Sequence, residues 1–514
     1  MKKLLMILFP LLLLPVFSAL AEPSVTFSPA APRVGDYVDV IVTPDRESPQ
    51  GYTYSLSLGE EAVYTGKDMS EHAAVSFRPR QEGVYTLTVT VTYGKKDQET
   101  ASVTVPVSGE APRQEGADVV YSQKDGWWHD KVYSKTYHRS VEKSGCALFA
   151  LSHALQRMGH ITDSAMPDAL ATRYSFCYVK DRGTSNEVLL TQAGKAFNFT
   201  TQSDLTESAA EIAACLNRGD LFSFDIVRSH IAMADGISED GTKVHVVDSA
   251  SGVTFERMVN GAVWIQAGDG SFVKAEKPED LPGNRWFFET QEYAGMEYWL
   301  DLDYCAKRGM RLIRQPWLKL ITEDGPVDVT LSQTGALISQ VQLEDETLTV
   351  ETRDLQWTSR GLEGPAVAMI TKKGGTSLLD ADDKKVPGFL KIPANTLLTV
   401  LEADKTRLYV PYKGKYGYIS RSDVELIPVT PDDFQRGTVS VNGKTAGSVQ
   451  ITIRSQASAK SASLTKWKVG TSVAVLGKKD DFYQVEARGI RGWIQEKYLT
   501  VEDDSNGQKV DEGE

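Results

Sequence analysis

Positively charged residues are in short supply in this sequence. Lysine and arginine total 56 against 69 aspartates and glutamates, which leaves a formal net charge of −13. Phosphate backbones and anionic membrane surfaces attract proteins with an excess of cationic side chains. We therefore expect no nucleic-acid partner and find no reason to expect an anionic membrane as one.

Long apolar runs are also missing, with one exception at the start of the chain. Lys2 and Lys3 precede an apolar run from Leu4 to about Leu20, which closes in Ala19-Leu20-Ala21. A positive start, a short apolar run and small residues at the cleavage position are typical of a signal peptide. An uncleaved anchor is disfavoured because the run is short and no Lys or Arg follows at once. Residues 1–21 are thus predicted to be removed, leaving a secreted or cell-wall-associated protein without membrane contact.

Cysteine is scarce too, with four positions in the whole chain. In an exported protein four cysteines could form two disulfides. If Cys146 must stay a free thiol, at most one bridge can form among Cys177, Cys215 and Cys305, and the sequence leaves that pairing open. Cys215 lies on an expected helix, where an inert buried thiol is the simpler interpretation.

The chain is too long for a single hydrophobic core, so about three to five domains are expected from its 514 residues. Residues 22–109 show strands of alternating apolar and polar residues, for example 37–42 and 83–91, separated by turn residues. This pattern favours a small immunoglobulin-like β-sandwich, and residues 79–88 resemble a late strand of bacterial surface immunoglobulin-like domains. The region has no catalytic cluster, which favours a spacer or adhesion module, and a polar linker follows at 109–116.

Residues 117–305 have a mixed α and β pattern. Apolar residues spaced three and four apart predict an amphipathic helix over 146–158 that ends before Gly159. Further helices are expected at 186–197 and 207–218, and strands at 221–227, 231–237 and 243–247, the last two forming a hairpin through the turn 238–242.

The C-terminal part returns to β structure and contains an internal repeat. Residues 306–362 form a β-rich connecting region without a recognisable motif. At a constant offset of 75, Gly414, Gly417 and Tyr418 match Gly489, Gly492 and Trp493. The two copies, 363–428 and 436–502, resemble the bacterial Src-homology-type small β-barrel, which implies cell-wall contact. The acidic tail, 503–514, is expected to be disordered.

Cys146 is the candidate nucleophile. It stands at the start of the expected helix, after Ser144-Gly145, with Ser144 expected near the N-cap. Unpaired backbone N–H groups and the helix dipole favour a negative sulfur at such a position. A cysteine that merely packs at a helix start is the alternative, and the Gly-Cys pair alone does not exclude it.

His230 and Asp248 are the candidate base and its orienting carboxylate. His230 begins one hairpin strand and Asp248 ends its partner, so antiparallel pairing places both at the same edge of the sheet. A carboxylate there can hold one imidazole nitrogen and leave the other for the thiol proton. A purely structural His–Asp pair is the alternative. His245, three residues from Asp248 and between valines, lies on the wrong face for this pairing.

These residues together resemble the bacteriocin-processing (double-glycine) peptidase family and its secreted relatives. The resemblance rests on Tyr121–Trp128, Ser144–Leu151, Gly219-Asp220, His230 and Asp248, and covers about 190 of 514 residues. It implies a papain-like α+β catalytic domain, flanked here by all-β modules, and Cys-His-Asp cleavage of peptide bonds.

Carried onto this sequence, the resemblance makes Cys146 the nucleophile, His230 the base, Asp248 its partner and Gln123 the oxyanion-hole side chain. Gln123 by itself would be interpreted as a surface loop residue, and Trp128 as packing under that loop. Ala147-Leu148-Phe149 departs from the Gly or Ala followed by Pro that the family often has after its cysteine. The family's transporter segments are also missing, so leader processing coupled to export is not expected.

No cofactor or metal site is expected. The histidines of the mixed region show no paired ligand spacing, and they are His129, His138, His153 and His160. The sequence thus predicts a secreted cysteine peptidase at or near the cell envelope, acting on peptides of peptidoglycan or of surface proteins, with wall contact through the barrels. A non-catalytic wall-binding or adhesion protein with an inert papain-like scaffold is the alternative, and hydrolysis is not distinguished from acyl transfer.

Overall fold

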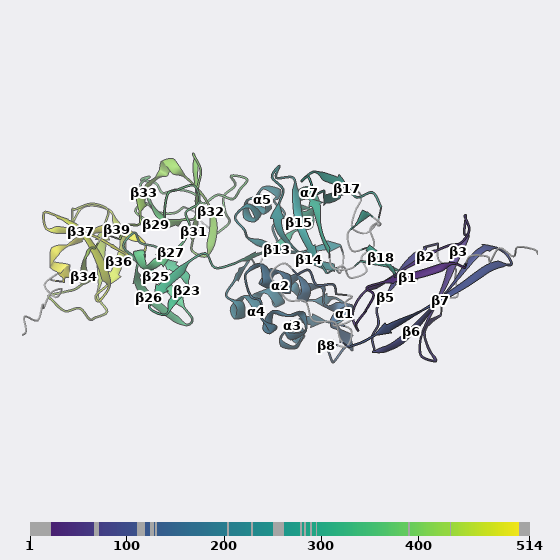
Figure 1. Ribbon diagram of the computed structural model, residues 1–514. Coiled ribbons are helices and arrows are strands. Elements are labelled where there is room, and N and C mark those ends of the chain that lie inside the picture. The colour runs from purple at the N-terminus through teal and green to yellow at the C-terminus, as the bar shows by residue number, and fades with distance from the viewer. Residues whose placement is uncertain are drawn as a thin grey trace, which may run out of the picture. The chain divides into compact units, whose positions relative to one another are not determined.

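The computed structural model describes residues 22–65, 71–109, 119–123, 128, 131–202, 205–227, 230–249, 262–277, 280–281, 284–287, 290–293, 296–388, 391–431 and 433–502. The expected signal peptide, most of the polar linker and the acidic tail lie outside these residues. The chain forms two compact units, one of residues 1–186, 223–235 and 243–301, the other of residues 187–222, 236–242 and 302–514. Both are built mainly from β-strands in several separate sheets (Figure 1).

The first unit begins with two antiparallel sheets. One has the order β1-β2-β5 and the other β4-β3-β6-β7. The inward residues of both, such as Val40 and Leu87, belong to one buried core, because alternate side chains of a strand point to the same face. The strands are β1 (Ser24–Ser28), β2 (Val38–Thr43), β3 (Gly51–Leu58), β4 (Glu61–Thr65), β5 (Ala74–Phe77), β6 (Gly83–Gly94) and β7 (Asp97–Val107).

The mixed part of the first unit places a buried helix against a sheet. Helix α2 (Cys146–Arg157) packs against α3 (Pro167–Arg173) and against β15 (Lys243–Asp248) (Figure 1). Every residue from Ala147 to Gln156 is buried, so the expectation of an amphipathic helix is wrong: α2 is covered on all sides. Strands β13, β14, β15, β20, β16 and β17 are neighbours in that order.

The bounds of these elements agree closely with the expected ones. Strand β13 spans Leu221–Val227, β14 spans His230–Ile237, and the turn between β14 and β15 is closed by a hydrogen bond from Gly241 N to Ser238 O. The remaining elements of this unit are β8 (Val132–Ser134), β9 (Arg139–Ser140), α1 (Val141–Ser144), β10 (Tyr178–Val179), β11 (Gly183–Thr184), β16 (Val263–Gln266), β17 (Phe272–Lys274), β18 (Asn284–Phe287), β19 (Thr290–Tyr293) and β20 (Met296–Asp301), with 3₁₀ turns at Asp163–Ala165 and Ser175–Cys177.

The second unit continues the mixed region and then turns to β structure. Helix α4 (Asn186–Phe197) matches its expected bounds, and α5 (Ala209–Asn217) begins after the N-cap Ser208. Strand β21, beyond the expected boundary at residue 305, pairs with β12 through Thr200 opposite Arg314. The other elements up to residue 356 are β12 (Thr200–Thr201), α7 (Leu302–Ala306), β21 (Met310–Arg314), β22 (Lys319–Thr322), β23 (Gly325–Asp328), β24 (Thr330–Gln333), β25 (Ile338–Leu343), β26 (Glu346–Glu351) and β27 (Leu355–Gln356).

The two sequence repeats share one hairpin register. Val410 lies opposite Gly417 in the first copy, and Val485 lies opposite Gly492 in the second. Both pairs differ by the offset of 75, so the repeat is structural as well as sequential. The strands are β28 (Ala366–Ile370), β29 (Leu397–Val400), β30 (Glu402–Ala403), β31 (Arg407–Tyr412), β32 (Lys415–Ser420), β33 (Val424–Pro428), β34 (Gln435–Val439), β35 (Gln450–Arg454), β36 (Ser463–Lys468), β37 (Ser472–Lys479), β38 (Phe482–Ala487), β39 (Ile490–Gln495) and β40 (Leu499–Val501).

Among the described residues, no helix combines the length and the apolar character that a bilayer crossing requires.

Candidate active site

Cys146 is the first residue of α2 and is half-buried. Ser144, expected near the N-cap, ends the short helix α1, and the adjacent Gly145 is the N-cap of α2 with φ −91° and ψ 3°. A Cβ on Gly145 would lie 2.5 Å from the backbone oxygen of Val141. Glycine is therefore required for the tight step from α1 into α2, which places the sulfur at the helix N-terminus.

His230 and Asp248 form a buried pair at the edge of the hairpin. Nε2 of His230 lies 2.6 Å from Oδ1 of Asp248, and the two residues are 2% and 0% exposed. The other carboxylate oxygen, Oδ2, accepts a hydrogen bond of 2.8 Å from the hydroxyl of Tyr298 on β20. The antiparallel arrangement of β14 and β15 thus brings together the two residues expected at one edge.

The environment of His230 favours its charged form. Burial opposes the charge, but the Asp248 carboxylate, by its charge and its hydrogen bond, and a side-chain hydrogen bond with Cys146 together raise the pKa of His230 to about 10. Because Nε2 is held by the carboxylate, Nδ1 is the ring nitrogen available to the sulfur. The imidazole and the carboxylate therefore form a hydrogen-bonded pair, and the Cys146 side chain lies near enough to raise the pKa of the imidazole.

Gln123 joins this group from a distant part of the sequence. It is buried, its backbone N–H donates to Ser249 O at 3.0 Å, and its Oε1 accepts from the Ser249 hydroxyl at 3.2 Å. Its Nε2 donates to the backbone oxygen of Glu142 at 2.7 Å. These contacts hold the amide between the residue after Asp248 and the turn of helix before Cys146.

Trp128 packs beneath this segment. Its ring is 1% exposed and meets Phe149 of α2 edge-on, with the ring centroids 5.4 Å apart. A second edge-on contact, at 5.9 Å, joins it to Tyr121. Trp128 therefore supports the segment that carries Gln123, while residues 124–127 lie outside the described part of the chain.

Two further histidines of the described residues, His245 and His153, have hydrogen-bond partners of their own. His245 Nδ1 pairs with Asp235 Oδ1 at 2.5 Å, and Asp235 also accepts from Arg157 Nε at 2.7 Å. His153 is buried, burial lowers its pKa to about 4, and its Nε2 accepts from Tyr121 N at 3.0 Å. The described residues contain no group of three His, Cys, Asp or Glu that could hold a metal ion, and His129 lies outside them.

All four cysteines are free thiols, and three of them are buried. Burial raises the pKa of Cys177 to about 11 and that of Cys215 to about 12. Cys305 is 0% exposed. Cys146 alone combines partial exposure with a neighbouring imidazole.

The sequence reasoning missed Tyr298, Ser249 and Glu142. Tyr298 holds the second oxygen of Asp248, and the other two residues hold the Gln123 amide. Tyr298 stands at an inward position of a strand with alternating burial, which indicates a buried hydroxyl in need of a partner. The alternating pattern of this strand could have predicted that Tyr298 is buried, but not that its hydroxyl contacts Asp248.

Comparison with known proteins identifies one domain. Residues 449–500 match the family model described as Bacterial SH3 domain. A stretch of 114 residues is 26% identical to the putative N-acetylmuramoyl-L-alanine amidase YrvJ of Bacillus subtilis strain 168, covering 21% of this chain and 22% of that protein. The chain thus spans about a fifth of the length of this curated relative.

Two solved structures show local similarity. NlpC2 and NlpC1 from Trichomonas vaginalis are 17% and 18% identical, each with a TM-score of 0.11. The matches cover 27% and 28% of this chain and 49% and 48% of those chains. The family match shows that residues 449–500 form a bacterial SH3 domain, which is the small-barrel type expected for the second repeat.

Proposed function

We propose that this chain is a secreted cysteine peptidase with a papain-like catalytic region, in which Cys146, His230, Asp248 and Gln123 act on a peptide bond. One observation carries the proposal: a half-exposed free thiol at a helix start lies close enough to a buried imidazole to raise its pKa, and a nitrogen of that imidazole is held by a buried carboxylate. A cysteine that only packs at a helix start needs neither neighbour. This combination is the arrangement required for an activated sulfur nucleophile.

In the first step Cys146 Sγ transfers its proton to Nδ1 of His230. The resulting imidazolium is stabilised by Asp248, whose charge favours the protonated ring. The thiolate then attacks the carbonyl carbon of the peptide bond, and the carbonyl π electrons move to its oxygen. The product of this step is a tetrahedral oxyanion bonded to the sulfur.

We assign two donors to that oxyanion. Cys146 is the first residue of α2, so its backbone N–H has no acceptor within that helix. The Gln123 amide nitrogen carries two hydrogens and gives one to Glu142 O. The second hydrogen can meet the developing charge, and the anchored amide reorganises little during the reaction.

The remaining steps return the protein to its starting state. His230 gives its proton to the leaving amine as the C–N bond breaks, which leaves a thioester on Cys146. Water then attacks the thioester while His230 accepts its proton. As the second tetrahedral intermediate collapses, the C–S bond breaks and the proton taken from water stays on His230, so the thiolate and the imidazolium, the pair formed in the first step, are restored.

We further propose peptides of peptidoglycan as the substrate class, with the protein acting outside the cytoplasm. Two features support it: the bacterial SH3 domain at residues 449–500 and the sequence similarity to a protein named as an N-acetylmuramoyl-L-alanine amidase. The expected signal peptide agrees with this location. Within this proposal the N-terminal sheets are an immunoglobulin-like spacer and the first repeat is a second small barrel.

Alkylation of Cys146 tests whether the sulfur is activated. Iodoacetamide at neutral pH should label Cys146 first, because burial keeps Cys177 and Cys215 protonated. His230→Ala should abolish this preference, and Cys177→Ala, the matched control, should retain it. Slow and uniform labelling of all four thiols would favour an inert scaffold.

Digestion assays test the substrate. Purified cell wall and casein are incubated with the wild-type chain, with Cys146→Ala and with Cys177→Ala. New amino termini should appear with the wild type and with Cys177→Ala but not with Cys146→Ala. New amino termini from casein alone would indicate that the substrates are proteins rather than peptidoglycan. If neither substrate is cleaved and all four thiols are labelled uniformly, the chain is a non-catalytic wall-binding protein.

A further inference from the structure

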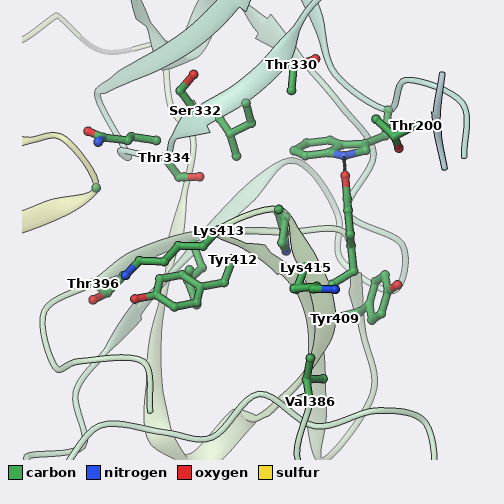
Figure 2. A pocket seen from close by; sticks show the side chains of 18 of the residues that line it. Thr200, Thr330, Ser332, Thr334, Val386, Thr396, Tyr409, Tyr412, Lys413 and Lys415 are labelled. Carbon is green, nitrogen blue, oxygen red and sulfur yellow. Dashed lines mark hydrogen bonds between the residues drawn. The ribbon is translucent and has the colours of Figure 1, made fainter. Parts of the chain in front are cut away.

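The second unit contains a cavity of about 1030 Å³ that belongs to none of the catalytic residues. Its walls come from the β12 segment, from β24 and from the β31–β32 hairpin. Figure 2 shows Thr330, Ser332 and Thr334 on one side and Tyr412, Lys413 and Lys415 on the opposite side. A hollow of this size exceeds what a single small molecule needs and suits a segment of a polymer.

Hydrogen bonds between the walls hold the cavity open. Trp317 Nε1 donates to the Tyr416 hydroxyl at 3.0 Å, and Arg314 donates to the Tyr409 hydroxyl at 3.1 Å. On another side Leu397 N donates to Gly489 O at 2.8 Å. Since these contacts already exist without a ligand, little ordering is required when one binds.

The charge of the lining is opposite to that of the chain. Exposed cations line the cavity, and within the described part of the chain none has a carboxylate at ion-pair distance: Lys373, Lys413, Lys415 and Arg488. The acids of the lining are already engaged, because Glu211 accepts from Ala381 N at 3.1 Å and Asp380 from Lys384 N at 2.8 Å. A group of unpaired cations in a protein of net charge −13 indicates an anionic ligand.

The uncharged part of the lining is rich in hydroxyls and aromatic rings. Thr330 and Ser332 on β24 are exposed, and Trp317 and Tyr412 are partly exposed rings. Hydroxyls match a ligand with many hydrogen-bonding groups, and amphipathic rings can pack against the apolar faces of sugar rings. An acidic peptide would not require this density of hydroxyls.

From this geometry we infer that the cavity binds an anionic glycan, a polysaccharide segment with carboxylates on alternating sugars. Its carboxylates pair with the lysines and its ring faces pack on Trp317 and Tyr412. The site requires neither Cys146 nor its partners. It would let the chain hold a polymer independently of cleaving a peptide.

Calorimetric titration of the full-length protein tests the inference with three probes of six residues each. These are a hyaluronate hexasaccharide, the neutral chitohexaose and a hexaglutamate peptide. The hyaluronate probe should bind most tightly and should weaken at high salt, because exposed ion pairs are screened. Equal binding of chitohexaose would contradict the anionic requirement, equal binding of hexaglutamate would assign the site to acidic peptides, and no binding of hyaluronate would overturn the proposal.

A charge-reversed variant locates the binding. Lys373→Glu combined with Lys415→Glu should weaken hyaluronate binding by about tenfold, since two attractive contacts become repulsive. Lys413 and Arg488 are left unchanged because their backbone φ is positive, at 48° and 50°, so that a substitution there could also disturb the turn. The matched control, Lys405→Glu with Lys466→Glu, changes the net charge equally on exposed lysines outside the lining. An equal loss in the control, or no loss in the cavity variant, would reject this site.

Discussion

Tyr298 donates a hydrogen bond of 2.8 Å to Oδ2 of Asp248, whose other oxygen, Oδ1, lies 2.6 Å from Nε2 of His230. Both oxygens of a carboxylate with 0% exposure are therefore engaged. A buried carboxylate held at both ends keeps one orientation, and so does the imidazole attached to it. Tyr298 is thus a positioning residue for His230 in the proposed mechanism.

Removal of this hydroxyl should weaken the site without removing a reacting group. Tyr298→Phe is expected to lower the free energy of unfolding by about 1–3 kcal/mol, because a buried charged acceptor loses a donor. The alkylation rate of Cys146 should fall in parallel as His230 loses its fixed orientation. Urea unfolding and iodoacetamide kinetics measure the two effects.

Tyr93→Phe is the matched control, since its hydroxyl donates to Asp45 Oδ1 at 2.7 Å in the N-terminal sheets. It should leave alkylation of Cys146 unchanged. A Tyr298→Phe variant that labels at the wild-type rate would remove the positioning role.

His230 should remain protonated well above the ordinary range of histidine. Its pKa is raised to about 10 in the folded chain, against about 6.5 in an unfolded one. The stabilisation from its charge is therefore fully present below pH about 6.5 and is lost as the pH rises through about 10. NMR titration of the imidazole, assigned with His230→Ala, should show the charged form at pH 8.

His153 provides the internal comparison in the same spectra. Burial lowers its pKa to about 4, so its ring should remain neutral at pH 5. A His230 signal that titrates near its unperturbed value would contradict the charge-stabilised pair.

Loss of the Gln123 amide should affect the oxyanion step and spare the nucleophile. Gln123→Ala is expected to reduce kcat by about 10²–10³-fold, the usual effect of removing one oxyanion donor. Alkylation by iodoacetamide forms no oxyanion, so its rate should change little. Gln266→Ala, an exposed amide of the same unit, should affect neither rate, and an equal fall of both rates in Gln123→Ala would indicate a structural role.

Gly145 should tolerate no side chain. The added Cβ of Gly145→Ala would lie 2.5 Å from Val141 O and 3.3 Å from the Phe149 ring, so α1 or α2 must shift. Overpacking of this kind costs about 1–3 kcal/mol, and both the thermal midpoint and Cys146 alkylation should fall. Gly268→Ala, where nothing lies within 4 Å of the new Cβ, should behave as wild type.

Asp220 should stabilise the fold through its ion pair with Arg314. The carboxylate accepts from the Arg314 guanidinium at 3.0 Å, and both side chains are less than a tenth exposed. Asp220→Asn leaves a buried cation without its counter-charge, which costs about 3–5 kcal/mol and should lower the urea midpoint. Asp433→Asn breaks an ion pair whose carboxylate is 93% exposed, and the same change there should have little effect.

The local pattern of apolar residues was sufficient to predict the bounds of helices and strands whose structure depends on a single segment. The expected helix 186–197 and strand 221–227 have the bounds of α4 and β13, because apolar spacing reflects each element's own geometry. The helix start at Cys146 was predicted correctly, and the cap is Gly145, the residue directly after Ser144. Ser144 caps helices by preference, whereas here the step through Gly145 is dictated by contact with Val141 and Phe149.

The sequence did not predict which individual polar residues are buried. Gln123 alone resembles a surface loop residue, yet Glu142 and Ser249 hold it in the interior. These partners stand 19 and 126 positions away. No periodicity connects segments at such separations.

The sequence by itself determined the helix and strand pattern, the repeat, the cysteine at a helix start and the shared edge of His230 and Asp248. That edge follows from a short turn between adjacent strands, which is local chain geometry. Only the tertiary structure decided that Tyr298 holds Asp248, that Gln123 is buried, and that lysines without a carboxylate partner line a cavity together with hydroxyls and aromatic rings. Side-chain partners depend on where distant backbone segments meet, and that placement is set by packing rather than by the pattern of any one segment.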